Sequence, residues 1–521
     1  MRLDDLLRGI ATPARGDIVV SGLTQDSRKV RAGDAFVALA GARAHGITFA
    51  PMAMAQGAVA VLAEVAGLGI RDSGLGENEN AGGFEHFLPP LAVEGAEGGW
   101  GPNIESVESK PVVWIENLRE QIGEIAARFF GRSSEALCVI GVTGTNGKTS
   151  TVQMLAQALT HLGQRAASIG TLGAGMHGAL AAGERTTPDV INVHALLASF
   201  RDAGASHVAM EVSSHALDQR RVDAVAFDVA VFTNLTRDHL DYHGTMDAYG
   251  AAKAKLFAWP GLRTAVINVD DAFGRELVAS LPSGVQLLRY AIDNDDAELR
   301  ALEIRTHADG IDFRLRTPWG AGVLHSRLLG RFNIANLLAV AGCLGALGFE
   351  FEAIRDALES LRPVAGRMNR LGGGDAPLVV VDYAHTPDAL QQALTTLRAH
   401  SQGKLICVFG AGGERDAGKR PQMGAIAEAH ADVCIVTDDN PRGEDGEKIV
   451  VAILEGFQNP SHAIVERDRA RAIALALRQA RAGDVVLIAG KGHEAYQEDA
   501  GIKHAFDDLA VARTVLEARA C

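Results

Sequence analysis

The segment GVTGTNGKTS, residues 141–150, joins an apolar stretch to an amphipathic one and contains three glycines, a lysine and several hydroxyl groups. Glycines allow a backbone to wrap around an anion, and Lys148 supplies a positive charge for the β- and γ-phosphates of a nucleotide. Thr149 is placed to bind Mg²⁺. We call this segment the phosphate loop. Val142 stands where a strict Walker A sequence has its first glycine, and a glycine-rich turn without a ligand is the structural alternative.

Two other segments carry candidate metal ligands after apolar stretches. MEVSSHAL contains Glu211, and VFTNLTRDH contains Asp238 and His239. A carboxylate and an imidazole at neighbouring strand ends could hold divalent cations. Considered alone, His239 is more commonly a hydrogen-bonded loop histidine, and Lys253 in YGAAKAKLF is an ordinary helix lysine. These residues alone leave a kinase, a motor and a ligase open.

The segment TDDNPRGED, residues 437–445, surrounds a single arginine with acids, and we call it the acidic loop. A solvated Asn-Pro turn is one interpretation. The other is a binding site for a substrate that carries both a carboxylate and an amine, in which Arg442 contacts the carboxylate.

The length of 521 residues and the succession of predicted strands and helices indicate three α/β domains. The sequence predicts domains at residues 1–134, 135–363 and 364–521. Strands are predicted at residues 17–23, 34–40, 58–65, 111–117, 137–143, 207–212, 229–235, 264–270, 377–384, 404–410, 431–439 and 484–490.

Three further stretches complete this outline. Residues 149–163 have helical periodicity, and residues 303–330 alternate as a hairpin does. Residues 67–110 are rich in Gly and Glu, and we expect a mobile insertion there. In open α/β sheets ligands bind at the carboxyl ends of the strands, where the candidate residues lie.

Composition favours small-molecule partners. With 50 Lys and Arg against 64 Asp and Glu, the net charge of -14 disfavours nucleic acids and anionic membranes as partners. The five cysteines lack metal-type spacing, and no apolar run of 18 residues occurs. We therefore expect a cytoplasmic protein with free thiols.

An ordered set of motifs resembles the Mur ligases of peptidoglycan synthesis. The set comprises GTNGKTS, EVSSHAL, NLTRDHLDYHG, AAKAKLF, GRFNIAN, GRMNRL, VDYAHTPDAL, GKRPQMG, DDNPR and GKGHE. The resemblance implies an N-terminal UDP-substrate-binding α/β domain, a central P-loop ATPase-like domain and a C-terminal Rossmann-like domain that binds an amino acid. It also implies a monomer that uses ATP and Mg²⁺ to form an amide through an acyl phosphate.

The resemblance assigns roles to individual residues. It implies nucleotide contacts at Gly144, Thr145, Asn146, Gly147, Lys148, Thr149, Ser150, Asn333, Arg367 and Asp382. It implies catalytic roles for Lys148, Glu211, His239 and Lys253, and metal binding by Thr149, Glu211, His239 and Lys253. Lys253 matches a lysine that CO₂ converts to a carbamate, N6-carboxylysine.

The same resemblance assigns the other substrates. Contacts to UDP-MurNAc-L-Ala-D-Glu are implied at Gln25, Ser27, Ala42, Arg43, Ala44, Arg185, Thr186, Thr187, Ser213, Gln219 and Arg221. Arg185 departs from the asparagine that is common in the family. Contacts to meso-diaminopimelate are implied at Arg420, Asp439, Asn440, Pro441, Arg442, Gly490 and Glu494.

Four rival functions stay open. An L-lysine-adding tripeptide synthetase or a folylpolyglutamate-synthase-like ligase would share the phosphate loop. A P-loop phosphotransferase would leave the phosphoryl group on its product, and a non-catalytic regulator would bind ATP and release nothing. The DNPR motif favours meso-diaminopimelate, because a guanidinium suits the extra carboxylate that lysine lacks.

Overall fold

The structure is a computed structural model that describes residues 1–41, 44–65, 111–183, 185–307, 310–399 and 401–520. The chain forms two compact units. The first contains Met1–Arg132, Asp189–Ala195 and Arg220–Val225, and the second contains Ser133–Pro188, Leu196–Gln219 and Ala226–Cys521. The whole of the expected insertion at 67–110, together with Ala42 and Arg43, lies outside the described residues.

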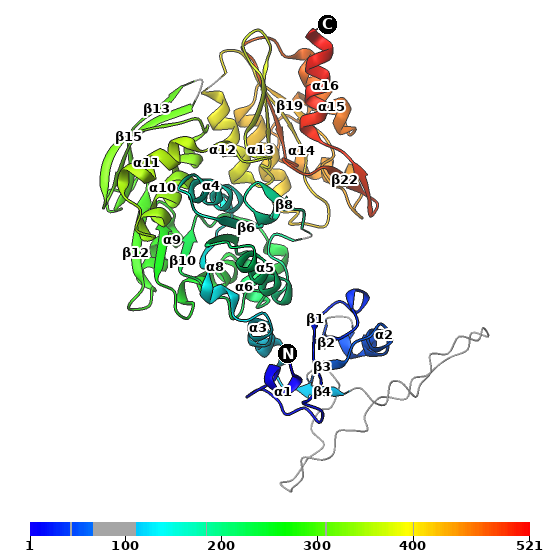
Figure 1. Ribbon diagram of the computed structural model, residues 1–521. Coiled ribbons are helices and arrows are strands. Elements are labelled where there is room, and N and C mark those ends of the chain that lie inside the picture. The colour runs from blue at the N-terminus through cyan, green and yellow to red at the C-terminus, as the bar shows by residue number, and fades with distance from the viewer. Residues whose placement is uncertain (42–43, 66–110, 184, 308–309, 400, 521) are drawn as a thin grey trace, which may run out of the picture. The chain divides into compact units, whose positions relative to one another are not determined.

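A four-stranded parallel sheet forms the centre of the first unit (Figure 1). Its strands follow the order β1 (Gly22–Thr24), β2 (Asp34–Ala38), β3 (Ala60–Glu64) and β4 (Val112–Ile115). Successive side chains of β2 point to opposite faces. Phe36 therefore packs with α2 (Ala50–Ala55), and Val37 packs with α3 (Leu118–Phe129). Covering both faces explains why β2 is buried along its whole length.

The strand predicted at residues 17–23 is mostly wrong. Only its last two residues belong to β1, because the apolar run before them pairs with the start of the chain. The Val20 amide donates to the Met1 carbonyl at 2.8 Å, and the Leu3 amide donates to the Ile18 carbonyl at 2.8 Å. The run thus packs beside α1 (Leu3–Leu6) and does not extend the sheet.

The second unit contains an eleven-stranded sheet in the order β15-β14-β13-β12-β11-β10-β5-β9-β6-β7-β8. Its strands are β5 (Cys138–Thr143), β6 (Ala166–Gly170), β7 (Gly173–Met176), β8 (Ala179–Ala181), β9 (His207–Glu211), β10 (Val229–Phe232), β11 (Thr264–Asn268), β12 (Gln286–Ala291), β13 (Leu299–His307), β14 (Gly310–Thr317) and β15 (Gly320–Ser326). In this spatial order, the neighbouring strands between β13 and β6 are parallel. The outer pairs, β15-β14-β13 at one edge and β6-β7-β8 at the other, are antiparallel. The hairpin pattern predicted at 303–330 is confirmed as β13–β15.

Helices cover this sheet and bury its core. They are α4 (Lys148–His161), α5 (Val190–Asp202), α6 (Ser214–Asp218), α7 (Leu240–His243), α8 (Met246–Ala254), α9 (Ala272–Ala279), α10 (Arg331–Ala346) and α11 (Phe351–Ser360). The apolar stripe predicted at Val152, Leu155, Leu159 and Leu162 is confirmed for the first three, which lie on α4 and are fully buried. They face α10, which packs beside α4 (Figure 1) and is apolar on nearly every side. Leu162 follows the helix and is partly buried.

A six-stranded sheet follows in the second unit, in the order β16-β17-β21-β18-β19-β20. Its strands are β16 (Asn369–Gly372), β17 (Leu378–Asp382), β18 (Leu405–Phe409), β19 (Val433–Val436), β20 (Ala463–Val465) and β21 (Val485–Ala489). All are parallel except β16. A short hairpin, β22 (Tyr496–Asp499) and β23 (Ile502–Ala505), lies outside this sheet.

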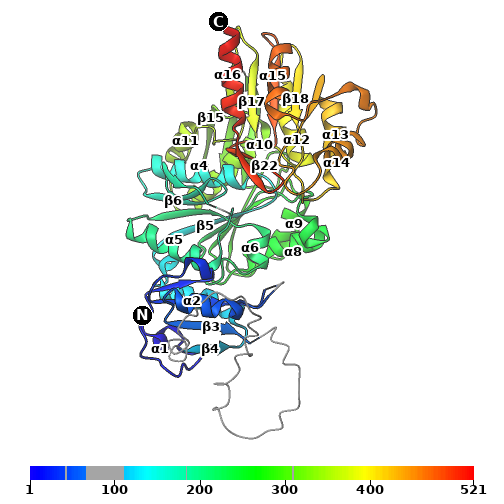
Figure 2. The same cartoon turned by 90° about the vertical axis from the view of Figure 1, so that its right-hand side faces the viewer.

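Helices pack on both faces of the six-stranded sheet (Figure 2). One face carries α12 (Pro387–Arg398), α13 (Lys419–His430) and α14 (Gly446–Leu454), and the other carries α15 (Arg469–Gln479) and α16 (Asp508–Ala520). This doubly wound arrangement confirms the predicted α/β class. No described helix is long and apolar enough to cross a membrane.

We predict that Leu337→Ala, in the middle of α10, lowers the free energy of unfolding by about 2–5 kcal/mol, because it leaves a cavity in a fully buried site. Val323→Ala is the matched control on β15, where the side chain is 49% exposed, and should cost at most about 1 kcal/mol. Urea unfolding followed by circular dichroism measures both. Equal midpoints for the two variants would contradict this account of the core.

Candidate active site

The phosphate loop connects β5 to α4 and is closed by its own lysine. Gly144 and Gly147 have φ values of 147° and 87°, which residues with a Cβ rarely adopt. The Lys148 Nζ donates to the carbonyls of Gly144 and Thr145, each at 2.8 Å. Burial lowers the pKa of Lys148. The loop therefore holds a lysine whose proton donors are aimed at backbone oxygens.

Residues after β10 support the loop, and sequence reasoning missed them. The Asn146 amide donates to Asn234 Oδ1 at 2.9 Å, and the Thr145 amide donates to the Asn234 carbonyl at 2.8 Å. The Thr233 hydroxyl donates to the Asn146 carbonyl at 2.6 Å. In the sequence the only trace of this role is the polar pair Thr233-Asn234 directly after an apolar strand.

Lys253 is buried beneath the same loop. It lies on α8 with 1% of its surface exposed, and its Nζ donates to the Gly144 carbonyl at 2.8 Å. The Nζ also lies 4.3 Å from the centre of the Tyr249 ring. Burial, with a contribution from the charge of Lys148, lowers the pKa of Lys253 well below its ordinary value. The surface-lysine alternative is thus wrong for this residue.

Glu211 lies at the end of β9 and joins the loop through Thr149. The Thr149 hydroxyl donates to Glu211 Oε2 at 3.0 Å, and the Thr171 amide donates to Glu211 Oε1 at 2.8 Å. An Arg367 NH2 group donates to Thr149 Oγ1 at 3.2 Å. Thr149 and Glu211, both expected near Mg²⁺, therefore lie in direct contact and provide oxygen donors.

Asp238 and His239 lie on the other side of the loop. β9 and β10 are separated by β5, so they are not the neighbouring strands that the prediction assumed. His239 Nε2 lies 3.5 Å from Asp238 Oδ2, and burial lowers the pKa of His239 to about 3. The Lys419 Nζ lies 3.7 Å from Asp238 Oδ1. Within the described ranges, no three His, Cys, Asp or Glu side chains form a group that could hold a metal by themselves.

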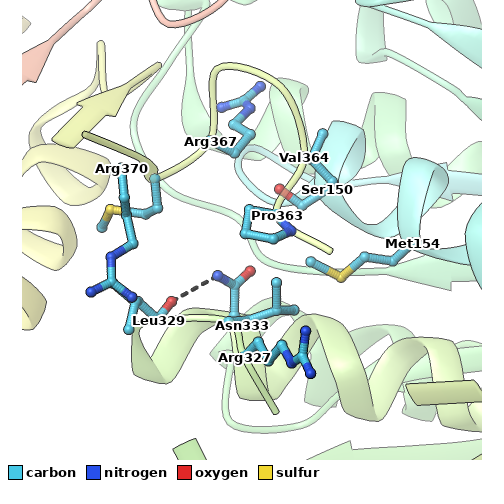
Figure 3. Close-up of a pocket in the computed structure, with 11 residues that line it drawn as sticks. Ser150, Met154, Arg327, Leu329, Asn333, Pro363, Val364, Arg367 and Arg370 are labelled. Carbon is cyan, nitrogen blue, oxygen red and sulfur yellow. Dashed lines mark hydrogen bonds between the residues drawn. The ribbon is translucent and has the colours of Figure 1, made fainter. Parts of the chain in front are cut away.

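A pocket opens beside α4 and is lined by residues that the nucleotide prediction named (Figure 3). Ser150, Asn333 and Arg367 line it, and the Asn333 side chain donates to the Leu329 carbonyl at 2.7 Å. Asp382 is not part of this lining. Its Oδ2 accepts the Met368 amide at 2.8 Å, and burial raises its pKa.

The other lining residues are mostly apolar: Met154, Leu328, Leu329, Pro363, Val364 and Met368, with Arg327 and Arg370. An apolar wall with a few amide and guanidinium groups suits a flat heteroaromatic ring. Asp382 instead fixes the backbone turn that carries Arg367, so it acts on the pocket indirectly.

The acidic loop follows β19 and holds Arg442 in a left-handed conformation, with φ 55°. The Arg442 amide donates to the Glu498 carbonyl at 3.0 Å, and its NH1 donates to the Gly413 carbonyl at 2.8 Å. The carbonyl oxygen of the preceding residue, Pro441, also packs against Gly413. A Cβ built at Gly413 would lie only 1.9 Å from that oxygen. Backbone contacts therefore fix the guanidinium before any ligand arrives.

Two other arginines lie near this loop and differ in their contacts. Arg420 is 3% exposed, and its NH1 and NH2 donate to the two carboxylate oxygens of Glu444, each at 2.7 Å. Arg415 is exposed, and its NH1 donates to the Glu414 carbonyl at 3.3 Å. A glycine, Gly412, lies against both the Arg442 guanidinium and the Arg415 stem. Sequence reasoning named Arg420, whose NH1 and NH2 groups already donate to Glu444, and did not name Arg415.

Asn440 and Glu494 bind one another at the base of the loop. The Asn440 side chain donates to Glu494 Oε2 at 2.7 Å and accepts from the buried Lys491 Nζ at 3.0 Å. The Asp439 carboxylate lies against Gly490, where a Cβ would be 2.2 Å from Asp439 Oδ2. Gly490 has φ 116°, so glycine is needed both for the turn and for this approach.

In the first unit, the residues expected to bind the UDP group lie in turns after β1 and β2. Ser27 is buried and begins a short 3₁₀ helix, which the Asp26 side chain caps. Gln25 is half-buried beside it. The Gly41 amide donates to the Ala44 carbonyl at 3.1 Å. Arg221 is half-buried in the segment Arg220–Val225 of this unit.

In the second unit, the residues expected near the dipeptide group surround the end of β9. The Thr187 hydroxyl donates to the Glu211 carbonyl at 2.8 Å, and Ser213 caps α6. The Thr186 and Thr171 hydroxyls lie 3.1 Å apart. The Gln219 side chain donates to the Tyr242 hydroxyl at 3.1 Å. Arg185, at the edge of a gap in the described residues, is exposed.

Three family models match the chain in succession. They are described as Mur ligase family, catalytic domain, at residues 19–130, Mur ligase middle domain at 142–344, and Mur ligase, glutamate ligase domain, at 366–492. Each predicted domain contains one match, although the exact domain boundaries stay a prediction.

Full-length relatives agree with these models. A protein of Xanthomonas campestris pv. campestris (strain 8004), named UDP-N-acetylmuramoyl-L-alanyl-D-glutamate–2,6-diaminopimelate ligase, is 56% identical over 518 residues, 99% of this chain and 97% of that protein. A Pseudomonas aeruginosa protein of the same name is 49% identical over 505 residues, 97% of this chain and 96% of that protein.

Solved structures are similar as well. A structure of a ligase with that name has a TM-score of 0.66 at 35% identity and covers 100% of this chain and 99% of its own. Folylpolyglutamate synthase of Mycobacterium tuberculosis has a TM-score of 0.61 at 20% identity over 71% of this chain and 91% of its own, and so shares the fold. From these matches and the geometry of its phosphate loop, we conclude that the chain belongs to the Mur ligase family.

Proposed function

We propose that the chain is an ATP-dependent ligase that joins meso-diaminopimelate to UDP-N-acetylmuramoyl-L-alanyl-D-glutamate in peptidoglycan biosynthesis. The observation that carries this proposal is the convergence of Lys148, Lys253 and the Thr149–Glu211 pair on one phosphate loop, in a chain whose full-length relatives carry that ligase name. We also expect a monomer that works in the cytoplasm.

The reaction has two chemical steps. The terminal carboxylate of the UDP-dipeptide attacks the γ-phosphorus of ATP, the bond to the β-phosphate oxygen breaks, and an acyl phosphate and ADP result. The amine of diaminopimelate then attacks the acyl carbon, and the tetrahedral intermediate expels phosphate and loses a proton to give the amide. Neither step needs a covalent bond to the protein, so the chain mainly positions reactants and neutralises charge.

The phosphate loop and its neighbours would bind ATP. Lys148 would exchange its backbone acceptors for phosphate oxygens, and Arg367 approaches from the side of Thr149. The pocket lined by Asn333 would take the adenine base, because its walls are largely apolar. Asp382 would hold Arg367 in place through the Met368 turn.

The residues around the loop fit magnesium ions and a carbamate. Thr149 and Glu211 would hold one ion, and His239 and the carbamate of Lys253 would contribute to metal binding at the loop. When bound, the ions neutralise phosphate charge, and the carbamate supplies an oxygen ligand where the described carboxylates and imidazoles are too few. A lowered pKa favours the neutral amine, which is the form that reacts with CO₂.

The acidic loop would bind diaminopimelate. Arg442 is held by backbone contacts and would bind the distal carboxylate, and Asp439 would accept the adjacent ammonium group. Asn440 and Glu494 would shape this end of the site. The resemblance names Arg420 as a contact to diaminopimelate. We infer that Arg415 makes a carboxylate contact in its place, because the Arg420 guanidinium is already paired with Glu444.

We propose the contacts to the UDP-dipeptide for each of the two units by itself. Gln25, Ser27, Ala44 and Arg221 would contact the substrate from the first unit, together with Ala42 and Arg43, which lie outside the described residues. Thr186, Ser213 and Gln219 would contact it from the second unit. Thr187 would act by fixing the backbone beside Glu211.

We predict that ADP release requires ATP, the UDP-dipeptide and meso-diaminopimelate together. L-Lysine should support little turnover, because it lacks the carboxylate that Arg442 would bind. Lys148→Ala should eliminate ADP formation. A coupled ADP assay measures these rates. Phosphoryl transfer to a product in the absence of an amino acid would instead identify a phosphotransferase.

We predict that Lys253→Ala lowers kcat by roughly 100-fold or more, because a metal ligand is lost, and that a short carboxylic acid partly restores it. With ¹³C-labelled bicarbonate, the wild-type protein should show a carbamate resonance that the variant lacks. Lys255→Ala is the matched control, since Lys255 is two residues away and half-exposed. Full activity of the alanine variant at position 253 would refute the metal role.

We predict that Arg442→Ala and Arg415→Ala each raise the KM for meso-diaminopimelate by about 10- to 150-fold, the equivalent of roughly 1.5–3 kcal/mol for a charge-assisted contact. The KM for ATP should stay nearly constant. Arg420→Ala should instead lower the thermal midpoint, because Glu444 loses its partner. An unchanged KM in Arg415→Ala would return that role to Arg420.

A further inference from the structure

A fully buried ion pair lies under the acidic loop, and none of the motifs above includes it. Arg469 begins α15 and Asp508 begins α16, two helices that pack side by side (Figures 1 and 2). Their Nε–Oδ1 and NH2–Oδ2 distances are 2.8 and 2.7 Å, and neither side chain is exposed. Burying two charges is costly even when they are paired, so stability alone is a weak reason for this pair.

The pair also contacts the end of β21. The Arg469 NH2 group donates to the carbonyl of Ala489 at 2.9 Å, directly before Gly490. A Cβ built at Gly490 would lie 3.9 Å from that same NH2 group and 2.2 Å from Asp439 Oδ2. The guanidinium and the Asp439 carboxylate therefore approach the same glycine.

One donor of Arg469 is left over. Its NH1 is buried and makes no hydrogen bond with any residue that the structure describes. Asp439 is 6% exposed, and its carboxylate likewise accepts no hydrogen bond from the described part of the chain. Burial raises the pKa of Asp439, and the charges of Arg469 and Lys491 oppose that rise. A buried carboxylate with a nearby cation and no donor of its own can accept a hydrogen bond from a ligand.

We infer that Arg469, clamped by Asp508, is a positioning residue that holds Gly490 and the Asp439 carboxylate in place for the ammonium group of the incoming amino acid. This inference rests on the proposed function. Asp508 binds the Nε–NH2 edge of the guanidinium, and the Ala489 carbonyl accepts from the same NH2 group. The positive charge of Arg469 opposes the rise in the Asp439 pKa that burial causes. Neither Arg469 nor Asp508 touches the substrate.

The test replaces the pair by apolar residues of similar size, Arg469→Met with Asp508→Leu, in the full chain. Such replacements often preserve folding. We expect the KM for meso-diaminopimelate to rise roughly tenfold or more, in line with the loss of one charge-assisted contact. The KM values for ATP and the UDP-dipeptide should each change less than about twofold, and kcat at saturating diaminopimelate should change little.

The control sits at the opposite end of the same strand. Asp484 precedes β21, and its carboxylate accepts the amides of Lys404 and Arg481 at 2.7 and 2.8 Å. Asp484→Asn should lower the thermal midpoint without changing the KM for diaminopimelate. Arg469→Lys keeps the charge but cannot make all three contacts, so its KM should rise less than that of the double variant. It also provides the measurement if the double variant does not fold.

The results distinguish a positioning role from a purely structural one. An unchanged KM for diaminopimelate in a folded double variant, or in Arg469→Lys if the double variant is unfolded, would overturn the inference. An equal rise for all three substrates, or the same rise in Asp484→Asn, would show that the pair only stabilises the fold, and would overturn it as well. A wild-type protein without diaminopimelate-dependent ADP release would refute the proposed function itself, and the inference with it.

Discussion

Two lysine side chains donate to a single carbonyl oxygen, and the chemistry proposed for the phosphate loop depends on that constraint. The Nζ atoms of Lys148 and Lys253 each lie 2.8 Å from the oxygen of Gly144. Burial lowers the pKa of both amines, and the positive charge of Lys148 lowers that of Lys253 further. An anion relieves the repulsion. A phosphate beside Lys148, or a carbamate formed from Lys253, would each provide one.

The sheet order explains why these groups meet. β5 has β9 on one side and β10 on the other, so the carboxyl end of β5 receives Glu211 from one neighbour and Asn234 from the other. Asn234 and Thr233 fix the loop backbone, while Glu211 fixes the Thr149 hydroxyl. These contacts hold the loop backbone in the positive-φ conformations that Gly144 and Gly147 allow.

The sequence predicts the fold class, most strands and the motifs at the strand ends, because buried parallel strands leave continuous apolar runs. It does not predict that residues 18–20 pair with the chain start, since that pairing depends on a distant partner. Nor does it distinguish Arg420 from Arg415. Each lies two residues after a glycine in one short stretch, and only the three-dimensional position of Glu444 reveals which guanidinium is engaged. Lys253 shows the same limit, because burial by Tyr249 and the loop is a tertiary effect.

The two ends of the site have opposite electrostatic character, and this favours a ligase over a phosphotransferase. Phosphoryl transfer alone needs only the positively charged phosphate loop, where Lys148 and Arg367 lie. An incoming amino acid needs an anionic group beside its ammonium group, and the proposed group is the buried carboxylate of Asp439, which follows β19. Arg367 precedes β16 in the same six-stranded sheet. That sheet therefore contributes to both ends, and we infer that it brings the amine to the acyl phosphate where the phosphate loop has formed it.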